Sequence, residues 1–165
     1  MSLIFRMLYV LFLSRRRERL PVVGGRSVLR LRVLPNDLDV NLHMNNGRFL
    51  TICDLNRVDL FIRTGLARLM AREGWRPIIA EHTMTYRKPL KPFQRYEVVM
   101  EVVRADERAF HMTHTFLAGG RVAAEGTSVG VVRGKEGVIP PAEVMRRLAP
   151  DGGAGEGAAR RLRQP

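Results

Sequence analysis

Ten residues in the first third of the chain, 37–46, carry two carboxylates, three amides and one imidazole. In an extended segment the side chains alternate between two sides, so polar and apolar residues would be separated here. The polar set is Asp39, Asn41 and His43, and the apolar set is Val40, Leu42 and Met44. This pattern predicts an acid, an amide and an imidazole on one face, with the acid available as a nucleophile or general base.

A helix is predicted to begin directly after this loop, at Gly47. The first N–H groups of a helix have no intrahelical partner and lie at its positive end. The N–H groups near Asn46 and Gly47 can therefore stabilise the oxyanion that forms when a carbonyl carbon is attacked. The alternative interpretation is structural: Asn45 or Asn46 caps the helix, while Asp37 and Asp39 are solvated turn residues.

The elements around the loop follow one order along the chain. Alternation predicts a strand at 28–34, and apolar residues at helical spacing predict a long helix at 47–72 with a bend or break at Gly65. Four more strands are predicted at 78–87, 96–104, 109–117 and 122–133, with a hairpin at Gly119-Gly120 and a final helix from Pro140-Pro141 to Leu148. This order predicts an α+β fold in which an antiparallel sheet wraps around one long central helix.

The chain length of 165 residues suits a single domain with two terminal additions. We expect an apolar and basic segment at 1–20 and the domain itself at 21–149. Residues 150–165 are rich in Gly, Ala and Arg and have little to bury, so this tail is expected to be disordered.

The N-terminal segment has an apolar run at 3–13 followed by Arg15, Arg16 and Arg17. Eleven helical residues span roughly 16 Å, about half the hydrocarbon core of a bilayer. The segment also differs from a signal peptide, because its charged residues follow the apolar run instead of preceding it. Two interpretations remain: an interfacial anchor through 3–17, or a helix packed on the domain or on a second copy. Apolar residues on all sides of the helix favour the anchor. The expected location is the cytoplasm, including the inner membrane surface.

The formal net charge is +12, and much of it lies at the chain ends. Residues 1–19 carry +4 and residues 146–165 carry +3, which leaves +5 for the body. This distribution suits an anionic surface or ligand better than a basic recognition face, and no nucleic-acid partner is expected. The chain has few lysines, so an arginine-biased composition explains the charge equally well.

Cys53 is the single cysteine, which excludes an intrachain disulfide. We expect it to pack in the core. The spacing of His82, His111 and His114 does not predict a metal site, and no cofactor is predicted. Asp54 is a second candidate base, but an ion pair with Arg57 at i+3 is the favoured interpretation.

The loop resembles the motif of hotdog-fold acyl thioesterases of the 4-hydroxybenzoyl-CoA thioesterase type. The motif reads Asp-x-Asp-x-x-Gly-His-Val-Asn-Asn, and the residues that match it are Asp37, Asp39, His43, Asn45 and Asn46. Phe49 stands where that family usually has tyrosine. The pattern Asp39-x-Asn41-x-His43 is most similar to plant-type acyl-ACP thioesterases. The wider chain also looks like a branch of thioesterase-like proteins with an apolar N-terminus. The resemblance covers residues 28–133.

This resemblance implies a role for each matching residue. Asp39 would be the catalytic carboxylate, and Asn41 and His43 would orient the substrate and the attacking group. The N–H groups of Asn46 and Gly47 would polarise the thioester carbonyl. Asn45 also belongs to the candidate site and would pin the loop by hydrogen bonds. The basic residues Arg87, Lys88 and Lys91 would either bind the phosphates of CoA or serve as charges on a strand edge.

The resemblance also implies an acyl-CoA thioesterase that hydrolyses an acyl-CoA or acyl-ACP thioester to a free acid and a thiol. A homodimer or homotetramer is expected, because an edge strand of the sheet has to be covered. One departure supports the alternative of a non-catalytic acyl-CoA-binding or membrane-associated hotdog protein. Plant-type members have a glutamate where this chain has Pro89, which offers no carboxylate.

Overall fold

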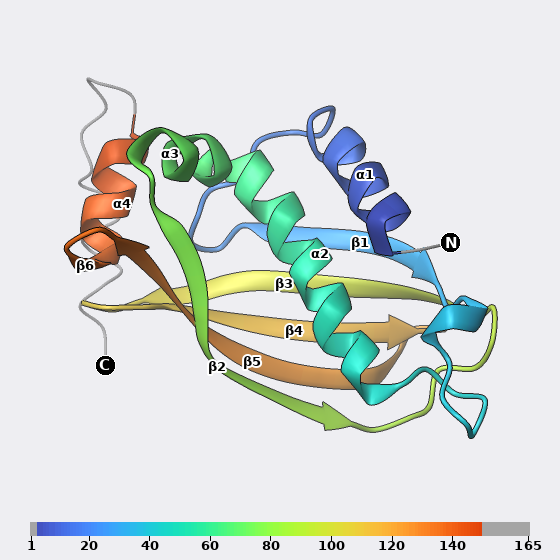
Figure 1. Cartoon of the computed structure of the whole chain (residues 1–165). Coiled ribbons are helices and arrows are strands. Elements are labelled where there is room, and N and C mark those ends of the chain that lie inside the picture. Colours follow the sequence, from blue (N-terminus) through green and yellow to red (C-terminus); the bar gives the residue numbers. More distant parts are fainter. Residues whose placement is uncertain (1–2, 150–165) are drawn as a thin grey trace.

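The structure is a computed structural model that describes residues 3–149. Its helices are α1 (Leu3–Ser14), α2 (Asn46–Thr64), α3 (Leu66–Glu73) and α4 (Pro141–Leu148), with a short 3-10 helix η1 (Pro35–Asp37). Its strands are β1 (Arg26–Arg32), β2 (Arg76–Tyr86), β3 (Arg95–Ala105), β4 (Phe110–Ala118), β5 (Arg121–Gly134) and β6 (Gly137–Ile139). The predicted α+β architecture is confirmed, because the antiparallel sheet β1-β3-β4-β5-β2 curls around α2 (Figure 1).

Helix α2 is defined at both ends by residues with clear backbone preferences. Asn45 is its N-cap, and Gly65 ends it in the left-handed conformation at φ 85°. Only glycine adopts this region without strain, so the chain turns there and restarts as α3. The predicted break at Gly65 is thus confirmed.

The core lies between α2 and the concave face of the sheet. Strand β3 buries every second residue from Tyr96 to Val102. Val98 packs in one cluster with Ile52 and Leu55 of the helix, and Met100 packs in a second cluster with Leu60. Strands β2 and β5 approach so closely that a side chain on Gly126 would collide with the Thr83 carbonyl. The short strand β6, which pairs with the end of β5, was not predicted from the sequence.

Helix α1 lies beside α2 and above β1 (Figure 1). Its inner face is partly polar: Arg6 forms a buried ion pair with Asp37, and the Ser14 hydroxyl donates to the buried carboxylate of Asp59 at 2.7 Å. The N-terminal segment therefore packs on the domain by one face. Among residues 3–149, no helix is long and apolar enough to cross a membrane. The expected disordered tail lies outside the described residues.

Candidate active site

The loop before α2 closes into a tight turn around the carboxylate of Asp39. The Asp39 N–H donates to the His43 carbonyl at 2.8 Å, and the Leu42 N–H donates to the Asp39 carbonyl at 3.1 Å. The Asp39 Oδ1 atom accepts the N–H groups of Asn41 at 2.9 Å and His43 at 3.3 Å. The carboxylate thus organises the turn with one oxygen, and the other is left without a hydrogen bond among the described residues.

The turn corrects the prediction of an extended loop. Val40 is 96% exposed and Leu42 is 65% exposed at a positive φ of 56°, so neither packs on an apolar side. Met44 alone of the three is buried. Alternation fails here because the chain reverses direction within five residues. The turn brings together Asp39, Asn41 and His43, because the Asp39 carboxylate accepts the backbone N–H groups of the other two. Within residues 3–149, no hydrogen bond joins the three side chains to one another.

Backbone hydrogen bonds hold the base of the turn to two neighbouring segments. The Met44 N–H donates to the Leu90 carbonyl at 2.9 Å, and the Asn45 N–H donates to the Asp37 carbonyl at 2.8 Å. The first bond places the chain that follows β2 beside the loop. Pro89, where plant-type enzymes have a glutamate, is therefore adjacent to a residue that holds the candidate site.

The start of α2 has one N–H group without an acceptor among residues 3–149. The Asn45 side chain caps the helix by accepting the Gly47 N–H at 2.8 Å, as the structural interpretation of the loop predicts. This bond occupies the Gly47 donor, which the resemblance assigned to the thioester carbonyl. In the described part of the chain, the Asn46 N–H has no acceptor. The Tyr86 hydroxyl, which the sequence reasoning missed, donates to the Asn46 carbonyl at 3.1 Å and brings the end of β2 to this point.

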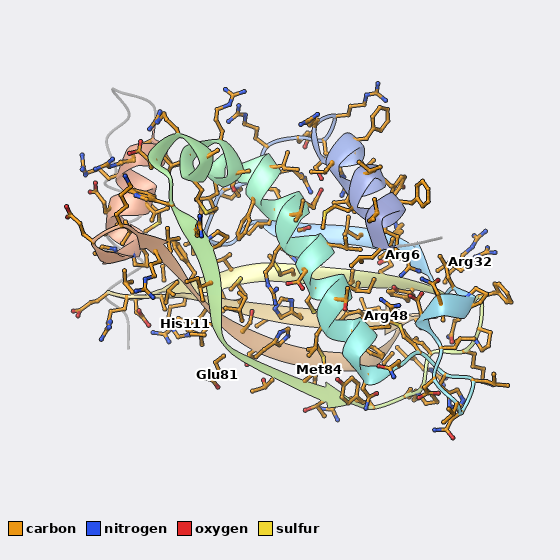
Figure 2. All side chains as sticks on the ribbon, viewed as in Figure 1. Arg6, Arg32, Arg48, Glu81, Met84 and His111 are labelled. Atoms are coloured by element: carbon orange, nitrogen blue, oxygen red, sulfur yellow. The ribbon has the colours of Figure 1, made fainter. Side chains whose placement is uncertain are left out.

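Asp37 has a different environment from the one predicted for a solvated turn residue. Its carboxylate is 1% exposed and forms an ion pair with Arg6 at 2.6 Å, and it accepts the Leu34 N–H at 2.9 Å. Arg48 approaches the same carboxylate at 3.8 Å, and Figure 2 shows Arg6 and Arg48 at this end of the molecule. The solvated interpretation is wrong because the decisive partner, Arg6, is 31 residues away in the chain.

The two basic residues that follow β2 differ in their freedom. The Arg87 guanidinium forms an ion pair with Glu125 across β2 and β5. The backbone N–H groups of Arg87 and Lys88 both donate to the Ala123 carbonyl, at 2.8 and 3.0 Å. Lys88 is exposed, and within residues 3–149 its ammonium group has no ion pair. Of the two, Lys88 is thus the cation more available to a phosphate.

The fold gathers Cys53, His82 and His114 beneath α2, although their spacing gave no such indication. One ligand-type atom from each lies within 4.8 Å of the others. Arg57 Nη2 lies 3.3 Å from His82 Nδ1, and His114 Nε2 lies 2.8 Å from the Ser128 hydroxyl. Because arginine only donates, His82 carries its proton on Nε2. A metal ion would have to displace that proton beside a fixed positive charge, so the cluster is better suited to neutral side chains.

The protonation of the cluster follows from its burial. Desolvation raises the pKa of the Cys53 thiol to about 12 and lowers that of His114 to about 3, while the pKa of His82 also falls. Arg57 is the next cause of the lowered values in both histidines. Cys53 is fully buried, which confirms the core prediction, and a thiol of this pKa is a poor nucleophile. The predicted ion pair between Asp54 and Arg57 is also present.

Comparisons with known proteins agree with this architecture. Residues 33–148 match a family model described as the thioesterase-like superfamily. Protein THEM6 of Xenopus laevis is 36% identical over 86 residues, which are 52% of this chain and 42% of that protein. The chain thus spans less than half the length of this relative.

Two solved structures share the fold at low sequence identity. YbaW, a probable thioesterase from Escherichia coli, superposes with a TM-score of 0.69 and 16% identity over 74% of this chain and 95% of its own. The gentisyl-coenzyme A thioesterase BH1999 gives a TM-score of 0.64 and 20% identity over 72% and 98% of the two chains. Together with the family match over most of the chain, these similarities show that the protein has the hotdog fold and belongs to the thioesterase-like superfamily.

Proposed function

We propose that this protein hydrolyses acyl-CoA thioesters and that Asp39 supplies the catalytic carboxylate. The observation that carries the proposal is the arrangement of Asp39 and Asn46. Among residues 3–149, a fixed turn holds one oxygen of the Asp39 carboxylate and leaves the other without a hydrogen bond, and the Asn46 N–H at the adjacent helix start has no acceptor. Such a pairing of a base or nucleophile with an oxyanion donor is what acyl transfer requires.

In the proposed reaction the free oxygen of Asp39 takes a proton from water as the water oxygen attacks the acyl carbon. The Asn46 N–H stabilises the resulting oxyanion. The C–S bond then breaks, and the proton passes to the departing sulfur, so that the products are a free acid and a thiol. Asn41 and His43 orient the water and the substrate from the same turn, and His43 is half-buried beside Asp39. Direct attack by Asp39 through an acyl anhydride is the covalent form of the same chemistry.

The acyl carrier is proposed to be CoA, with acyl-ACP as the competing substrate. Lys88, near the end of β2, offers a cation with no ion pair among residues 3–149, and Arg87 would have to leave Glu125 to bind a phosphate. We further propose a homodimer or homotetramer, because β2 pairs with β5 on one side and exposes its other edge. The location is proposed to be the cytoplasm, including the inner face of the membrane.

The second candidate function is acyl-CoA binding without hydrolysis. It is favoured by Pro89, because the chain beside the loop brings no carboxylate where plant-type enzymes have a glutamate. In that case Asp39 would serve only to shape the turn through its Oδ1 atom.

Free-thiol release from a panel of acyl-CoA chain lengths tests the proposal. We expect turnover in the parent protein and a loss of roughly 10²- to 10⁴-fold in Asp39→Asn, the range for acid–base groups. Asp106→Asn is the matched control, since Asp106 Oδ1 also accepts two backbone N–H groups, those of Arg108 and Ala109, in the turn between β3 and β4. Binding of acyl-CoA without thiol release by the parent would support the second candidate.

A further inference from the structure

Helix α1 presents its large apolar side chains to the outside of the molecule. The exposed set, 36–69% accessible, is Leu3, Ile4, Phe5, Leu8, Tyr9 and Phe12. Intervals of three and four residues place Phe5, Leu8 and Phe12 on one side of the helix, in a stripe along its length. A surface helix normally turns such a stripe toward the core. Single exposed apolar residues are ordinary on protein surfaces, whereas a contiguous patch marks an interaction site.

The orientation of α1 is fixed by polar contacts on its inner face. Arg6 donates to both carboxylate oxygens of Asp37, at 2.9 and 2.6 Å, and both side chains are buried. At the other end of the helix Ser14 donates to Asp59. Rolling α1 to bury its apolar stripe would strand the buried charges of Arg6 and Asp37, which is strongly destabilising, and would also expose Val10, which the present orientation buries. The stripe is therefore held outward by the fold.

Positive charges stand at both ends of the stripe. Arg15 and Arg16 follow the last turn of α1 and are exposed, and the Arg16 guanidinium lies 3.7 Å from the centre of the Phe12 ring. Near the other end, the Arg6 guanidinium donates to the Arg32 carbonyl at 2.9 Å, which places the end of β1 beside α1. The apolar surface of α1 thus lies between two groups of arginines.

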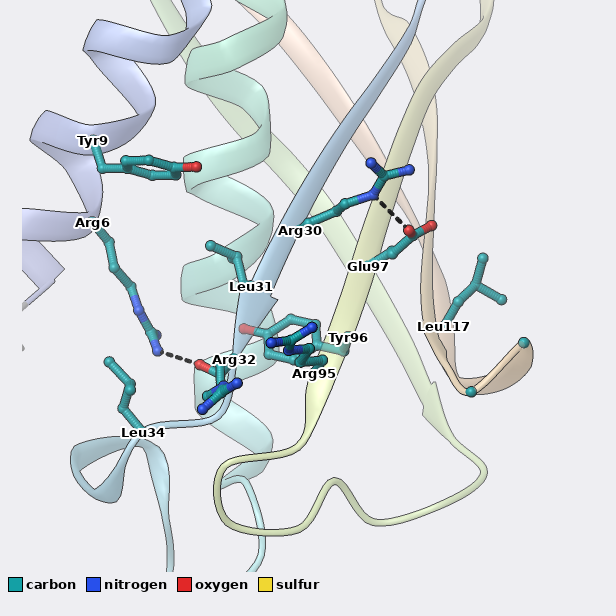
Figure 3. A pocket seen from close by; sticks show the side chains of 12 residues that line it. Arg6, Tyr9, Arg30, Leu31, Arg32, Leu34, Arg95, Tyr96, Glu97 and Leu117 are labelled. Carbon is teal, nitrogen blue, oxygen red and sulfur yellow. Dashed lines mark hydrogen bonds and ion pairs between the residues drawn. The ribbon is translucent and has the colours of Figure 1, made fainter.

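The arginines near the start of α1 border a cavity of about 760 Å³ between α1, β1 and β3 (Figure 3). The cavity does not include the loop around Asp39. Arg30 is paired with Glu97 at 2.8 Å, but Arg32 and Arg95 stand directly opposite each other in the β1–β3 register and form no ion pair within residues 3–149. Like charges in this position repel, so a bound anion would relieve a cost built into the sheet.

We propose that α1 docks this protein on the surface of an anionic lipid bilayer. The helix lies in the plane of the membrane with its apolar stripe at the boundary between headgroups and acyl chains. Arg15 and Arg16 contact lipid phosphates at one end of the stripe, and Arg32 and Arg95 contact them at the other. Its twelve residues span about 18 Å, which suits a helix lying on a bilayer rather than across it.

A second copy of the chain fits this surface less well. Two stripes packed together would bring arginines against arginines at both ends, in either relative orientation. Of the two edge strands, β2 lies at the opposite side of the sheet from β1 and α1 (Figure 1), so continuing the sheet through β2 would not cover α1. Charge complementarity therefore selects the lipid surface.

Vesicle flotation of the full chain tests the docking. The parent protein is expected to float with vesicles that mix phosphatidylglycerol with phosphatidylcholine, and to float much less with phosphatidylcholine alone. A triple variant, Phe5→Ser, Leu8→Ser and Phe12→Ser, should lose roughly 10-fold or more of its partitioning, because it removes most of the apolar contact. The control changes two exposed apolar residues elsewhere, Val103→Ser and Val138→Ser, and should float as the parent does.

The charges are tested with Arg32→Gln and Arg95→Gln in one protein. This variant should bind anionic vesicles several-fold more weakly than the parent, and salt should weaken the parent in the same way because it screens exposed charges. All variants alter exposed side chains, so unfolding temperatures should stay close to that of the parent. Equal flotation of the parent and the triple variant would overturn the proposal. The proposal would also be overturned if the parent did not float and formed a dimer in light scattering without lipid, while the triple variant was monomeric. That result would identify the stripe as a contact between copies.

Discussion

Asp37 and Asp39 are separated by one residue, and the fold gives their carboxylates opposite surroundings. Asp37 is buried, paired with Arg6 and bonded to the Leu34 N–H. Asp39 is half-buried, and one of its oxygens has no partner among residues 3–149. A carboxylate whose oxygens are all engaged contributes to stability and is unavailable for a reaction, whereas a held carboxylate with an open oxygen can accept a proton. The same contrast separates Arg87, which is paired with Glu125, from Lys88.

The largest expected change in stability comes from Asp37→Asn. Removing one partner of a buried ion pair leaves the Arg6 charge uncompensated, so the free energy of unfolding should fall by about 3–5 kcal/mol. Chemical denaturation monitored by circular dichroism measures this loss. Glu97→Gln, which breaks the exposed pair with Arg30, is the matched control and should cost no more than about 1 kcal/mol. Equal losses in the two variants would remove the distinction between the buried and exposed pairs.

His43→Ala is expected to reduce turnover by roughly 10- to 100-fold, less than Asp39→Asn, because an orienting side chain leaves the base in place. Thiol-release kinetics on the purified variant provide the measurement. His111→Ala serves as the control, since His111 pairs with Asp106 in a turn away from the loop. A loss as large as that of Asp39→Asn would instead assign proton transfer to His43.

Acid should destabilise the protein through the histidines under α2. Burial lowers the pKa of His114 from 6.5 to about 3 and lowers that of His82 as well. The unfolded chain therefore binds protons before the folded chain does. The stability that His114 contributes is fully present above pH 6.5 and falls as the pH drops toward 3, by up to about 1.4 kcal/mol per pH unit, and His82 acts in the same direction. Denaturation at a series of pH values should show this slope, and His114→Asn should flatten it.

The smallest expected effects concern Lys88 and Arg87. Lys88→Ala should raise the KM for acyl-CoA by several-fold at unchanged kcat, since the ammonium is free to bind a phosphate. Arg87→Ala should raise it less, because the guanidinium is engaged by Glu125. Acyl-pantetheine, which lacks the nucleotide phosphates, should show neither effect. A larger KM change in Arg87→Ala would mean that the ion pair opens when substrate binds.

The parts of the fold that depend on local pattern could be predicted from the sequence. Strand alternation, the glycine at the end of α2 and the asparagine cap are decided by nearby residues, and these predictions are confirmed. The environment of Asp37 could not be predicted, because it depends on Arg6, which approaches through tertiary packing. The cluster of Cys53, His82 and His114 was missed for the same reason, since its members come from three different elements.

The loop around Asp39 lies between these cases. Its residue types indicated chemistry, but the assumption of an extended chain misplaced Val40 and Leu42, which are exposed. The positive φ of Leu42 closes the turn, and a leucine gives no sequence signal for that conformation. The candidate residues could therefore be identified, while their arrangement around the carboxylate of Asp39 required the structure.

The most direct test measures turnover and stability together for Asp39→Asn and Asp37→Asn. Thiol release from an acyl-CoA should fall by roughly 10²- to 10⁴-fold in Asp39→Asn with little change in its unfolding midpoint. Asp37→Asn should lose stability and, at a temperature where it is folded, keep turnover near that of the parent. Parental turnover in Asp39→Asn, or a loss of turnover in folded Asp37→Asn as large as that expected for Asp39→Asn, would contradict the assignment of catalysis to Asp39 and of structure to Asp37.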